Sequence, residues 1–159
     1  MKTKTLGFIG GGRVTKIILQ ALRNKKVEFD SIAVYEPNEE TVAGLKKSFP
    51  DIFVAATPQE AAKQDIVFLA VHPPVMMETL GNIKDAVSGD TVVISLAPKI
   101  PISKMEEILP AKRIVRMIPN ATSYINKGYN PVTFNSAFTP EEKKVLIKML
   151  KKAGKTMEV

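Results

Sequence analysis

Three consecutive glycines near the start of the chain form the pattern that points most directly to chemistry. Gly10, Gly11 and Gly12 follow the apolar run "TLGFI" and precede an amphipathic stretch that begins near Arg13. Glycine inside a regular element costs about 0.5–1 kcal/mol relative to alanine, so three together indicate that the main chain itself must approach something. A diphosphate fits this pattern. Gly10 would allow a tight turn, and Gly12 would leave no side chain between the backbone and a phosphate.

The helix expected after the glycines would supply the electrostatics of such a site. Its free N–H groups and positive dipole end would point at the phosphate, with Arg13 and Val14 in the first turn. The Arg13 guanidinium could bind phosphate bidentately or stand as an ordinary surface group. Thr15 replaces the third glycine of the usual fingerprint and is larger than the residues common there. The context predicts a dinucleotide-binding turn, and a glycine-rich turn without a ligand is the alternative.

A carboxylate lies where the second predicted strand ends. Glu36 follows "SIAVY", 21 residues after Thr15. A carboxylate in this place can accept hydrogen bonds from an adenosine ribose, which favours NAD over NADP. The alternative is an ordinary exposed glutamate before Pro37. Because Arg13 could meet a phosphate, the choice between NAD and NADP stays open.

The spacing of apolar residues along the chain predicts the strands and helices that would position these residues. Predicted strands cover residues 5–9, 31–35, 52–56, 65–71, 91–97, 113–118, 131–135 and 155–159. Predicted helices cover residues 13–22, 38–48, 75–86, 102–108 and 140–153, with a short one after Thr57-Pro58. Continuous apolar strands that alternate with helices are typical of a parallel sheet covered on both faces. We therefore expect one Rossmann-type α/β domain over residues 1–159, with a doubly wound, mostly parallel sheet and helices on both faces.

The first and last predicted helices have apolar faces at helical spacing. These faces comprise Val14, Ile17, Ile18, Ala21 and Leu22 in the first helix and Val145, Leu146, Met149 and Leu150 in the last. The last helix also has a capping box, in which Thr139 is the N-cap, Pro140 the first helical residue and Glu142 the reciprocal partner. Gly154 would end this helix.

Composition excludes several classes of function. The 159 residues contain no cysteine and one histidine, His72, which excludes disulfides, thiolate metal sites and a histidine-rich metal site. No run is long and apolar enough to span a membrane and no signal peptide is evident, so we expect a cytoplasmic protein. The net charge of +7 comes from dispersed lysines without interleaved aromatic residues. That pattern indicates a solvated surface that could steer an anionic small molecule, and not a nucleic-acid site.

Four segments resemble the N-terminal domain of the pyrroline-5-carboxylate reductase family in order and spacing. They are "GFIGGGRV", "DIVFLAVHPP", "ISLAPKIP" and "RIVRMIPNATSYINKGYN". The resemblance covers nearly the whole chain, and its most specific part is the segment 116–122 with Gly128 downstream. It implies an NAD(P)-dependent oxidoreductase of proline biosynthesis that acts on a C–N bond, and on these family grounds NADP is slightly favoured over NAD. Hydride would pass from NAD(P)H to the imine carbon of a cyclic imino acid.

The resemblance also assigns residues to the cofactor, and it implies no catalytic residue and no metal ligand within this chain. Around the pyrophosphate it places Gly10, Gly11, Gly12, Arg13 and Val14. Along the dinucleotide it places Ala70, Val71, His72 and Pro73. At the nicotinamide end it places Ala97, Pro98 and Asn120.

Departures from the family pattern leave the substrate open. His72 stands where the family usually has lysine and is expected to be a wall of the site and not an acid or base. Pro74 replaces a common glutamine, and Pro98-Lys99 replaces an alanine-glycine pair. Family members continue into a helical domain that dimerises and supplies much of the imino-acid pocket. We therefore expect cofactor binding without efficient turnover from these residues, and a homo-oligomer only if such a domain exists.

Two alternatives to this function remain. The first is a reductase of the same superfamily with another substrate, such as a deazaflavin-dependent NADP reductase, which shares the glycine loop but matches the later segments less well. The second is a non-catalytic module that senses the dinucleotide.

Overall fold

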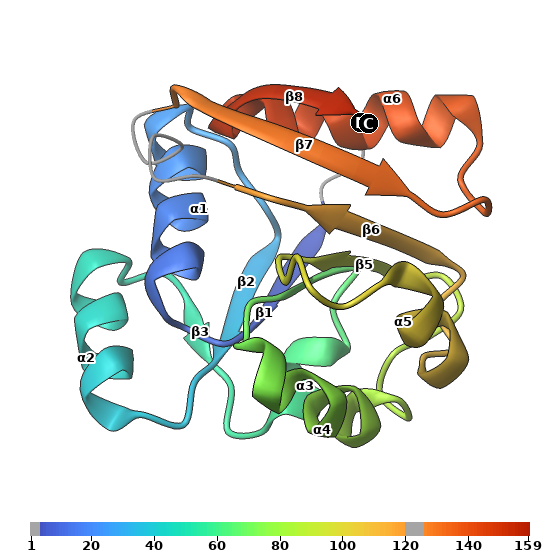
Figure 1. Cartoon of the computed structure of the whole chain (residues 1–159). Helices are drawn as coiled ribbons and strands as arrows, with labels where there is room; N and C mark the ends of the chain where they lie inside the picture. The colour runs from blue at the N-terminus through green and yellow to red at the C-terminus, as the bar shows by residue number, and fades with distance from the viewer. Residues whose placement is uncertain (1–3, 120–125) are drawn as a thin grey trace.

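An eight-stranded sheet forms the centre of the part of the chain that this computed structural model describes, residues 4–119 and 126–159 (Figure 1). The strands stand in the order β3-β2-β1-β4-β5-β6-β7-β8. They are β1 (Thr5–Ile9), β2 (Ser31–Tyr35), β3 (Phe53–Val54), β4 (Ile66–Leu69), β5 (Val92–Ser95), β6 (Arg113–Met117), β7 (Gly128–Phe134) and β8 (Gly154–Glu158). The helices are α1 (Arg13–Asn24), α2 (Glu39–Ser48), α3 (Pro58–Ala62), α4 (Pro73–Ile83), α5 (Ile102–Ile108), α6 (Pro140–Leu150) and the 3-10 turn η2 (Lys151–Ala153).

The sheet is parallel from β3 to β6 and confirms the predicted doubly wound α/β fold. The chain builds β1, β2 and β3 outward in one direction and then returns to place β4 on the other side of β1. This reversal creates a topological switch point between β1 and β4, the place where open α/β sheets bind ligands. β7 runs antiparallel to β6, and β8 is parallel to β7.

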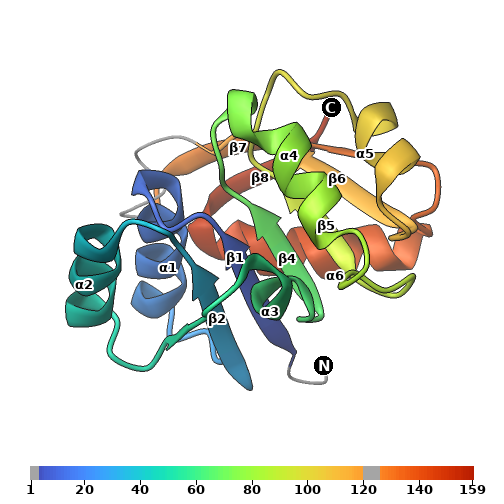
Figure 2. The ribbon, with the colours of Figure 1, turned by 90° about the horizontal axis from the view of Figure 1, so that it is seen from below.

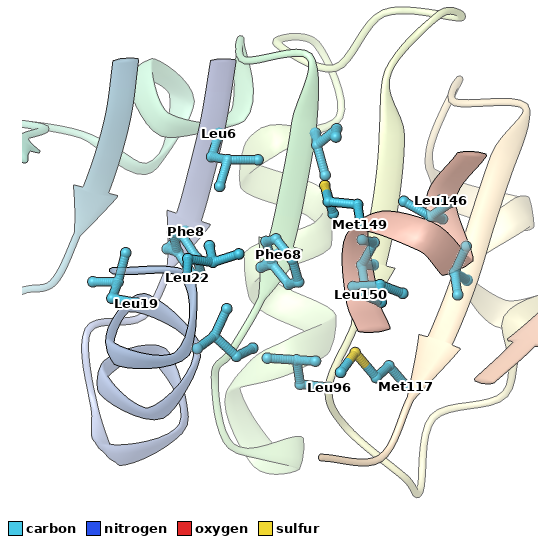
Figure 3. Packing of buried hydrophobic residues seen from close by; sticks show 14 of the residues in the cluster. Leu6, Phe8, Leu19, Leu22, Phe68, Leu96, Met117, Leu146, Met149 and Leu150 are labelled. Carbon is cyan, nitrogen blue, oxygen red and sulfur yellow. The ribbon is translucent and has the colours of Figure 1, made fainter. Parts of the chain in front are cut away.

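Helices cover both faces of the sheet (Figures 1 and 2). α1, α2 and α6 bury their apolar side chains in one cluster, and α3, α4 and α5 bury theirs in a second cluster on the opposite face. In the first cluster the rings of Phe8 and Phe68 stack across β1 and β4 with centroids 4.8 Å apart. Leu22 of α1 lies beside the rings, with Leu19 of α1 on one side of them and Leu150 of α6 on the other (Figure 3). Both faces of the central strands are therefore buried, which explains their continuous apolar sequences.

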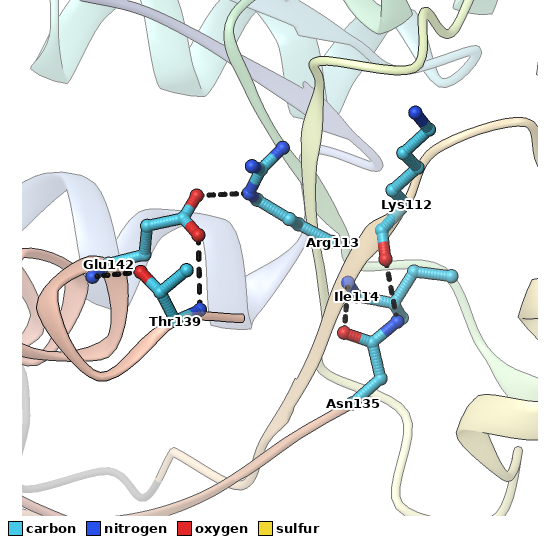
Figure 4. Close-up of polar contacts among 6 residues, drawn as sticks. All are labelled: Lys112, Arg113, Ile114, Asn135, Thr139 and Glu142. Atoms are coloured by element: carbon cyan, nitrogen blue, oxygen red, sulfur yellow. Dashed lines mark hydrogen bonds and ion pairs between the residues drawn. The ribbon is translucent and has the colours of Figure 1, made fainter. Parts of the chain in front are cut away.

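The predicted capping box of α6 is confirmed. The Glu142 amide donates to Thr139 Oγ1 at 3.2 Å, and the Thr139 amide donates to Glu142 Oε1 at 3.0 Å (Figure 4). Glu142 also forms an ion pair with Arg113 at the start of β6. The hydrogen bond from the Thr139 backbone holds the pKa of Glu142 below its ordinary value, and Arg113 lowers that pKa further while desolvation opposes both. The cap therefore fastens the start of α6 to the sheet.

Replacing Glu142 by glutamine is expected to lower the melting temperature near neutral pH but not in strong acid. Since the pKa of Glu142 is lower in the folded state, its carboxylate stabilises the fold above the unfolded-state pKa. That contribution is lost as the pH falls through the folded-state pKa. Circular dichroism melts from about pH 7 to about pH 2 should show wild type and variant converging. Glu141→Gln, on the exposed side of the same turn, is the control. An acid-independent deficit of Glu142→Gln would contradict the linkage.

Two helix predictions were wrong at their ends. The helix expected at 75–86 begins at Pro73 and ends at Ile83, because proline fits the first helical position and His72 serves as N-cap. The last helix does not run to Gly154. It gives way to η2 after Leu150, and Gly154, with φ of +141°, opens β8 against Gly128.

Two predicted inner faces also need correction. Val145 is 47% exposed because, at about 100° per residue, it lies at the margin of the stripe centred on Leu146 and Leu150. In α1 the fully buried set contains Thr15 and Leu19, whereas Val14 and Ile17 are only half-buried. The true face of α1 is therefore rotated slightly from the one that apolar residue types indicate.

Several strands begin or end at residues other than those predicted from the sequence. β3 keeps only Phe53–Val54 of the predicted 52–56, as a short strand at the edge of the sheet. β7 begins at Gly128, earlier than the predicted 131, because its first residues pair with β8. No helix among residues 4–119 and 126–159 is long and apolar enough to cross a bilayer.

Candidate dinucleotide-binding site

The carboxyl ends of the parallel strands meet at one edge of the sheet. The last residue of β1, Ile9, is level with Tyr35 of β2 and with Leu69 of β4, and Leu69 is level with Ser95 of β5. The segments that follow these strands, residues 10–12, 36–38, 70–73 and 96–98, therefore leave the sheet side by side. All of the predicted cofactor residues in the described part of the chain lie on these segments or in the first turn of α1.

Gly10 makes the tight turn out of β1 that the sequence predicts. Its φ is +105°, a conformation that side chains disfavour, and a Cβ atom there would lie 2.6 Å from the carbonyl oxygen of Ala70. The Gly10 amide donates to the Tyr35 carbonyl at 2.8 Å. The hydroxyl of buried Thr15 donates to the Gly10 carbonyl at 2.6 Å. Threonine at the third fingerprint position thus links α1 to the glycine turn through a side-chain hydrogen bond, which glycine or alanine could not form.

Replacing Thr15 by valine is expected to lower the free energy of unfolding by about 1–3 kcal/mol, because a buried carbonyl loses its donor while the volume stays constant. Urea unfolding followed by circular dichroism would measure this. Thr79→Val is the matched control, since the Thr79 hydroxyl bonds to the Val75 carbonyl one turn earlier in α4, an acceptor already within the helix ladder. Equal losses for the two variants would show that the bond to the Gly10 turn has no special weight.

The first turn of α1 presents free backbone donors at the switch point. Gly12 is the N-cap and has no side chain to cap the helix, and the first helical bond runs from the Lys16 amide to the Gly12 carbonyl at 3.2 Å. A Cβ atom added to Gly12 would meet nothing within 4 Å, so the space in front of the helix is open. Arg13 is exposed beside this space, and Val14 is half-buried. Such a helix end binds anions through its amides and its dipole.

Glu36 is held against the glycine turn. Its Oε1 accepts a hydrogen bond from the Gly11 amide at 2.9 Å, and its Oε2 accepts one from the Asn38 amide at 2.9 Å. A Cβ atom on Gly11 would lie 2.9 Å from Glu36 Cβ and 2.7 Å from Leu45 Cδ1, so glycine is required for this approach. Gly11 is therefore needed for the close approach and hydrogen bond to the Glu36 carboxylate, whereas Gly12 leaves room for a ligand.

The segment after β4 forms the second wall of the switch point. The Ala70 amide donates to the Ile9 carbonyl at 2.9 Å, which keeps this segment beside the glycine turn. Ala70 and Val71 are half-buried. His72 is an exposed N-cap of α4 without a side-chain capping bond, and Pro73 is the first helical residue. These four positions therefore lie beside the glycine turn, and His72 is the one of them that is exposed.

The segment after β5 lies one strand further along the same edge. Ala97 is buried and its amide donates to Ser95 Oγ at 3.2 Å, while Pro98 is exposed. Asn120, the remaining predicted cofactor contact, lies outside the described residues. A cavity of about 340 Å³ occurs at the opposite edge of the sheet, lined by the first residues of β4, β5 and β6 and by α6, so it is separate from the candidate site. Among the described residues no cluster of three metal-ligating side chains is present.

Sequence comparison places the chain in a family. The pattern of the family described as "NADP oxidoreductase coenzyme F420-dependent" matches residues 5–99, which include the glycine turn, Glu36 and the walls of the switch point. The chain belongs to this family.

Similarity to individual family members extends beyond residue 99. The chain is 36% identical over 142 residues to pyrroline-5-carboxylate reductase of Escherichia coli, covering 87% of this chain and 52% of that protein. It is 30% identical over 159 residues to pyrroline-5-carboxylate reductase of Corynebacterium melassecola, covering 98% and 59%. The chain thus spans somewhat more than half the length of these relatives.

Solved structures agree with the fold of this NADP oxidoreductase family member. Pyrroline-5-carboxylate reductase from Coxiella burnetii superposes with a TM-score of 0.85 at 25% identity, over 99% of this chain and 59% of that one. Plasmodium falciparum pyrroline carboxylate reductase, solved with NADP bound, superposes with a TM-score of 0.85 at 22% identity, over 100% and 58%.

Contacts that the residue pattern did not predict also shape the site of this family member. Arg116, at the end of β6, donates from Nη2 to the Pro98 carbonyl at 2.6 Å and so fixes the segment after β5. Its Nε is buried and has no hydrogen-bond partner among the described residues. Arg116 begins the segment 116–122, the most specific part of the resemblance to the reductase family. That resemblance was the feature of the sequence from which a role for Arg116 could have been predicted.

Proposed function

We propose that this chain is the dinucleotide-binding domain of an oxidoreductase that reduces a cyclic imine of the pyrroline-5-carboxylate type with NADH or NADPH. The observation that carries the proposal is the open start of α1 at the switch point, where Gly12 makes no side-chain capping bond and an added Cβ atom would meet no residue beyond its chain neighbours within 4 Å. The similarity to pyrroline-5-carboxylate reductases that continues past residue 99 supports the substrate class. Domain limits of 1–159 and a further substrate-binding region are part of the same proposal.

The residues present fit a dinucleotide. The amides at the start of α1 would hold the pyrophosphate, with Gly10 shaping the turn and Arg13 beside the anion. Ala70, Val71, His72 and Pro73 would line the dinucleotide, Ala97 and Pro98 the nicotinamide end, and Asn120 would contact the carboxamide or ribose. When bound, the reduced nicotinamide supplies a hydride for the imine carbon while a proton goes to the nitrogen. The chain's own part is to orient the ring and exclude water.

Direct titration tests this proposal. Nicotinamide fluorescence of NADH and NADPH is expected to change on binding to the chain, with saturation below millimolar cofactor. Turnover of pyrroline-5-carboxylate is expected from a longer form that includes the region present in its relatives. Absence of binding by both cofactors at millimolar concentration would refute the proposed function.

A second candidate is an NADP reductase that uses a deazaflavin, favoured by the family pattern over residues 5–99. It shares the cofactor site but not the substrate. Reduction of a deazaflavin by the longer form, without turnover of pyrroline-5-carboxylate, would favour this candidate.

A further inference from the structure

The turn between β2 and α2 is where the adenosine ribose of a dinucleotide bound at the glycine turn would lie. In this chain the turn contains the carboxylate of Glu36, and the first turn of α2 adds those of Glu39 and Glu40. Glu36 is half-buried and fixed at both oxygens, by the amides of Gly11 and Asn38, each at 2.9 Å. Its carboxylate is therefore part of the rigid wall of the site and not a mobile surface group.

The backbone donors that would bind a phosphate at this turn are largely occupied by the protein itself. Glu36 takes the Asn38 amide, and the Asn38 side chain takes the Thr41 amide at 3.0 Å as the N-cap of α2. The two intervening amides belong to Glu39 and Glu40, whose own carboxylates are placed in the first turn of the helix. An anion approaching α2 would meet these side chains before the helix dipole.

No cation neutralises this wall from the β2–α2 segment. The sequence from Val27 to Leu45 contains no lysine, arginine or histidine, and the cations of α2 stand in its last turn at Lys46 and Lys47. Arg13 is an exposed cation on the neighbouring segment, next to Gly12 at the start of α1. A phosphate monoester carries about −1.5 to −2 charges near neutral pH, so its addition to the ribose would place like charges together.

We propose that Glu36 makes this chain selective for NAD(H) over NADP(H). An ionised carboxylate offers about four acceptor sites, and two are used by the Gly11 and Asn38 amides, so capacity remains for a ribose hydroxyl. A 2′-phosphate would instead meet the negative charge of Glu36, and the segment from Val27 to Leu45 contains no cation to offset the repulsion. This inference rests on the proposed function and goes beyond it, because the family pattern carries NADP in its description and the Plasmodium falciparum relative was solved with NADP bound.

The experiment measures dissociation constants of NADH and NADPH by nicotinamide fluorescence for the wild-type chain and three variants. The wild type is expected to bind NADH at least about tenfold more tightly, since hydrogen bonds to charged groups are worth about 1.5–3 kcal/mol. Glu36→Ser is expected to weaken NADH, strengthen NADPH and reverse or abolish the preference. Glu28→Gln, an exposed charge removed at the opposite edge of the sheet, is the control and should leave both constants unchanged. Arg13→Ala should weaken the binding of both cofactors by a similar factor, because the proposed function assigns Arg13 to the pyrophosphate that they share.

A second measurement, on the wild type alone, tests whether the preference for NADH arises from charge repulsion or from the shape of the site. Raising the salt concentration screens the carboxylates and is expected to narrow the gap between NADH and NADPH. Binding of NADPH as tight as that of NADH would overturn the selectivity while leaving the proposed function intact. Binding of neither cofactor would overturn the proposed function and the selectivity with it. A Glu36→Ser variant with an unchanged ratio would show that another group discriminates.

Discussion

A Gly12→Val variant is expected to lose detectable binding of NADH, by at least about 100-fold, while it remains folded. The added side chain would occupy the open space at the start of α1, where a Cβ atom meets no residue beyond its chain neighbours within 4 Å, and would hold a phosphate away from the helix amides. Loss of two charge-assisted hydrogen bonds of about 1.5–3 kcal/mol each accounts for a factor of this size. The fold should survive because the Cβ of valine would meet no residue beyond its chain neighbours within 4 Å, and the extended backbone of Gly12 suits a β-branched residue. Its poorer N-cap propensity costs about 1 kcal/mol, or about 2–4 °C in melting temperature.

The matched control is Gly81→Val, another glycine with nothing within 4 Å of an added Cβ, on the exposed side of α4. It is expected to leave NADH binding unchanged and to raise stability slightly, because valine is a better helix former than glycine. Fluorescence titration and thermal melts on the two variants separate ligand exclusion from general damage. NADH affinity preserved in Gly12→Val would place the pyrophosphate elsewhere.

The sequence was sufficient where the signal is local. The glycine run between "TLGFI" and an amphipathic stretch predicted the tight turn at Gly10, where the structure has a positive φ, and the open space at Gly12. Thr139, Pro140 and Glu142 predicted the capping box because all of its partners lie within one turn. Apolar runs predicted a buried parallel sheet, since covering both faces removes the polar half of each strand.

The sequence was insufficient where contacts join distant segments. The bond from Thr15 to Gly10 turned an apparent departure from the fingerprint into a structural link. The grip of Glu36 on the Gly11 amide, 25 residues away, depends on the register of β1 and β2. Arg116 reaches Pro98 only because β5 and β6 are neighbours. Residue types alone do not reveal which strands are neighbours or how they are aligned, so these contacts could be identified only from the structure.

The strand that leads into the site contains a glycine with a different requirement. Gly7 of β1 faces α3, and a Cβ atom there would lie 1.9 Å from the carbonyl oxygen of Ala61 and 3.0 Å from Gln64 Cγ. Gly7↔Ala33 and Gly7↔Val67 pairs hold β1 in register on both sides, so the strand cannot move aside. α3 must retreat instead, and its buried residues lose their packing.

Gly7→Ala is therefore expected to destabilise the fold by about 3 kcal/mol, the upper part of the usual range for overpacking. For a chain of this size that lowers the melting temperature by roughly 6–12 °C. Gly44→Ala, where an added Cβ meets nothing within 4 Å, should instead be stabilising by about 1 kcal/mol, as expected for alanine in a helix interior. A melting temperature of Gly7→Ala equal to that of wild type would show that α3 yields at no cost.

The cofactor links this stability effect to the site. NADH at 100 times its dissociation constant adds about 2.7 kcal/mol to any form that binds it only when folded. Gly7→Ala retains the turn, the start of α1 and Glu36, so NADH is expected to raise its melting temperature by about as much as that of wild type. The melting temperature of Gly12→Val should not rise with NADH, although this variant is expected to be more stable than Gly7→Ala. The two glycines thus separate what the main chain does for packing from what it does for the ligand, and a rise in Gly12→Val would remove the distinction.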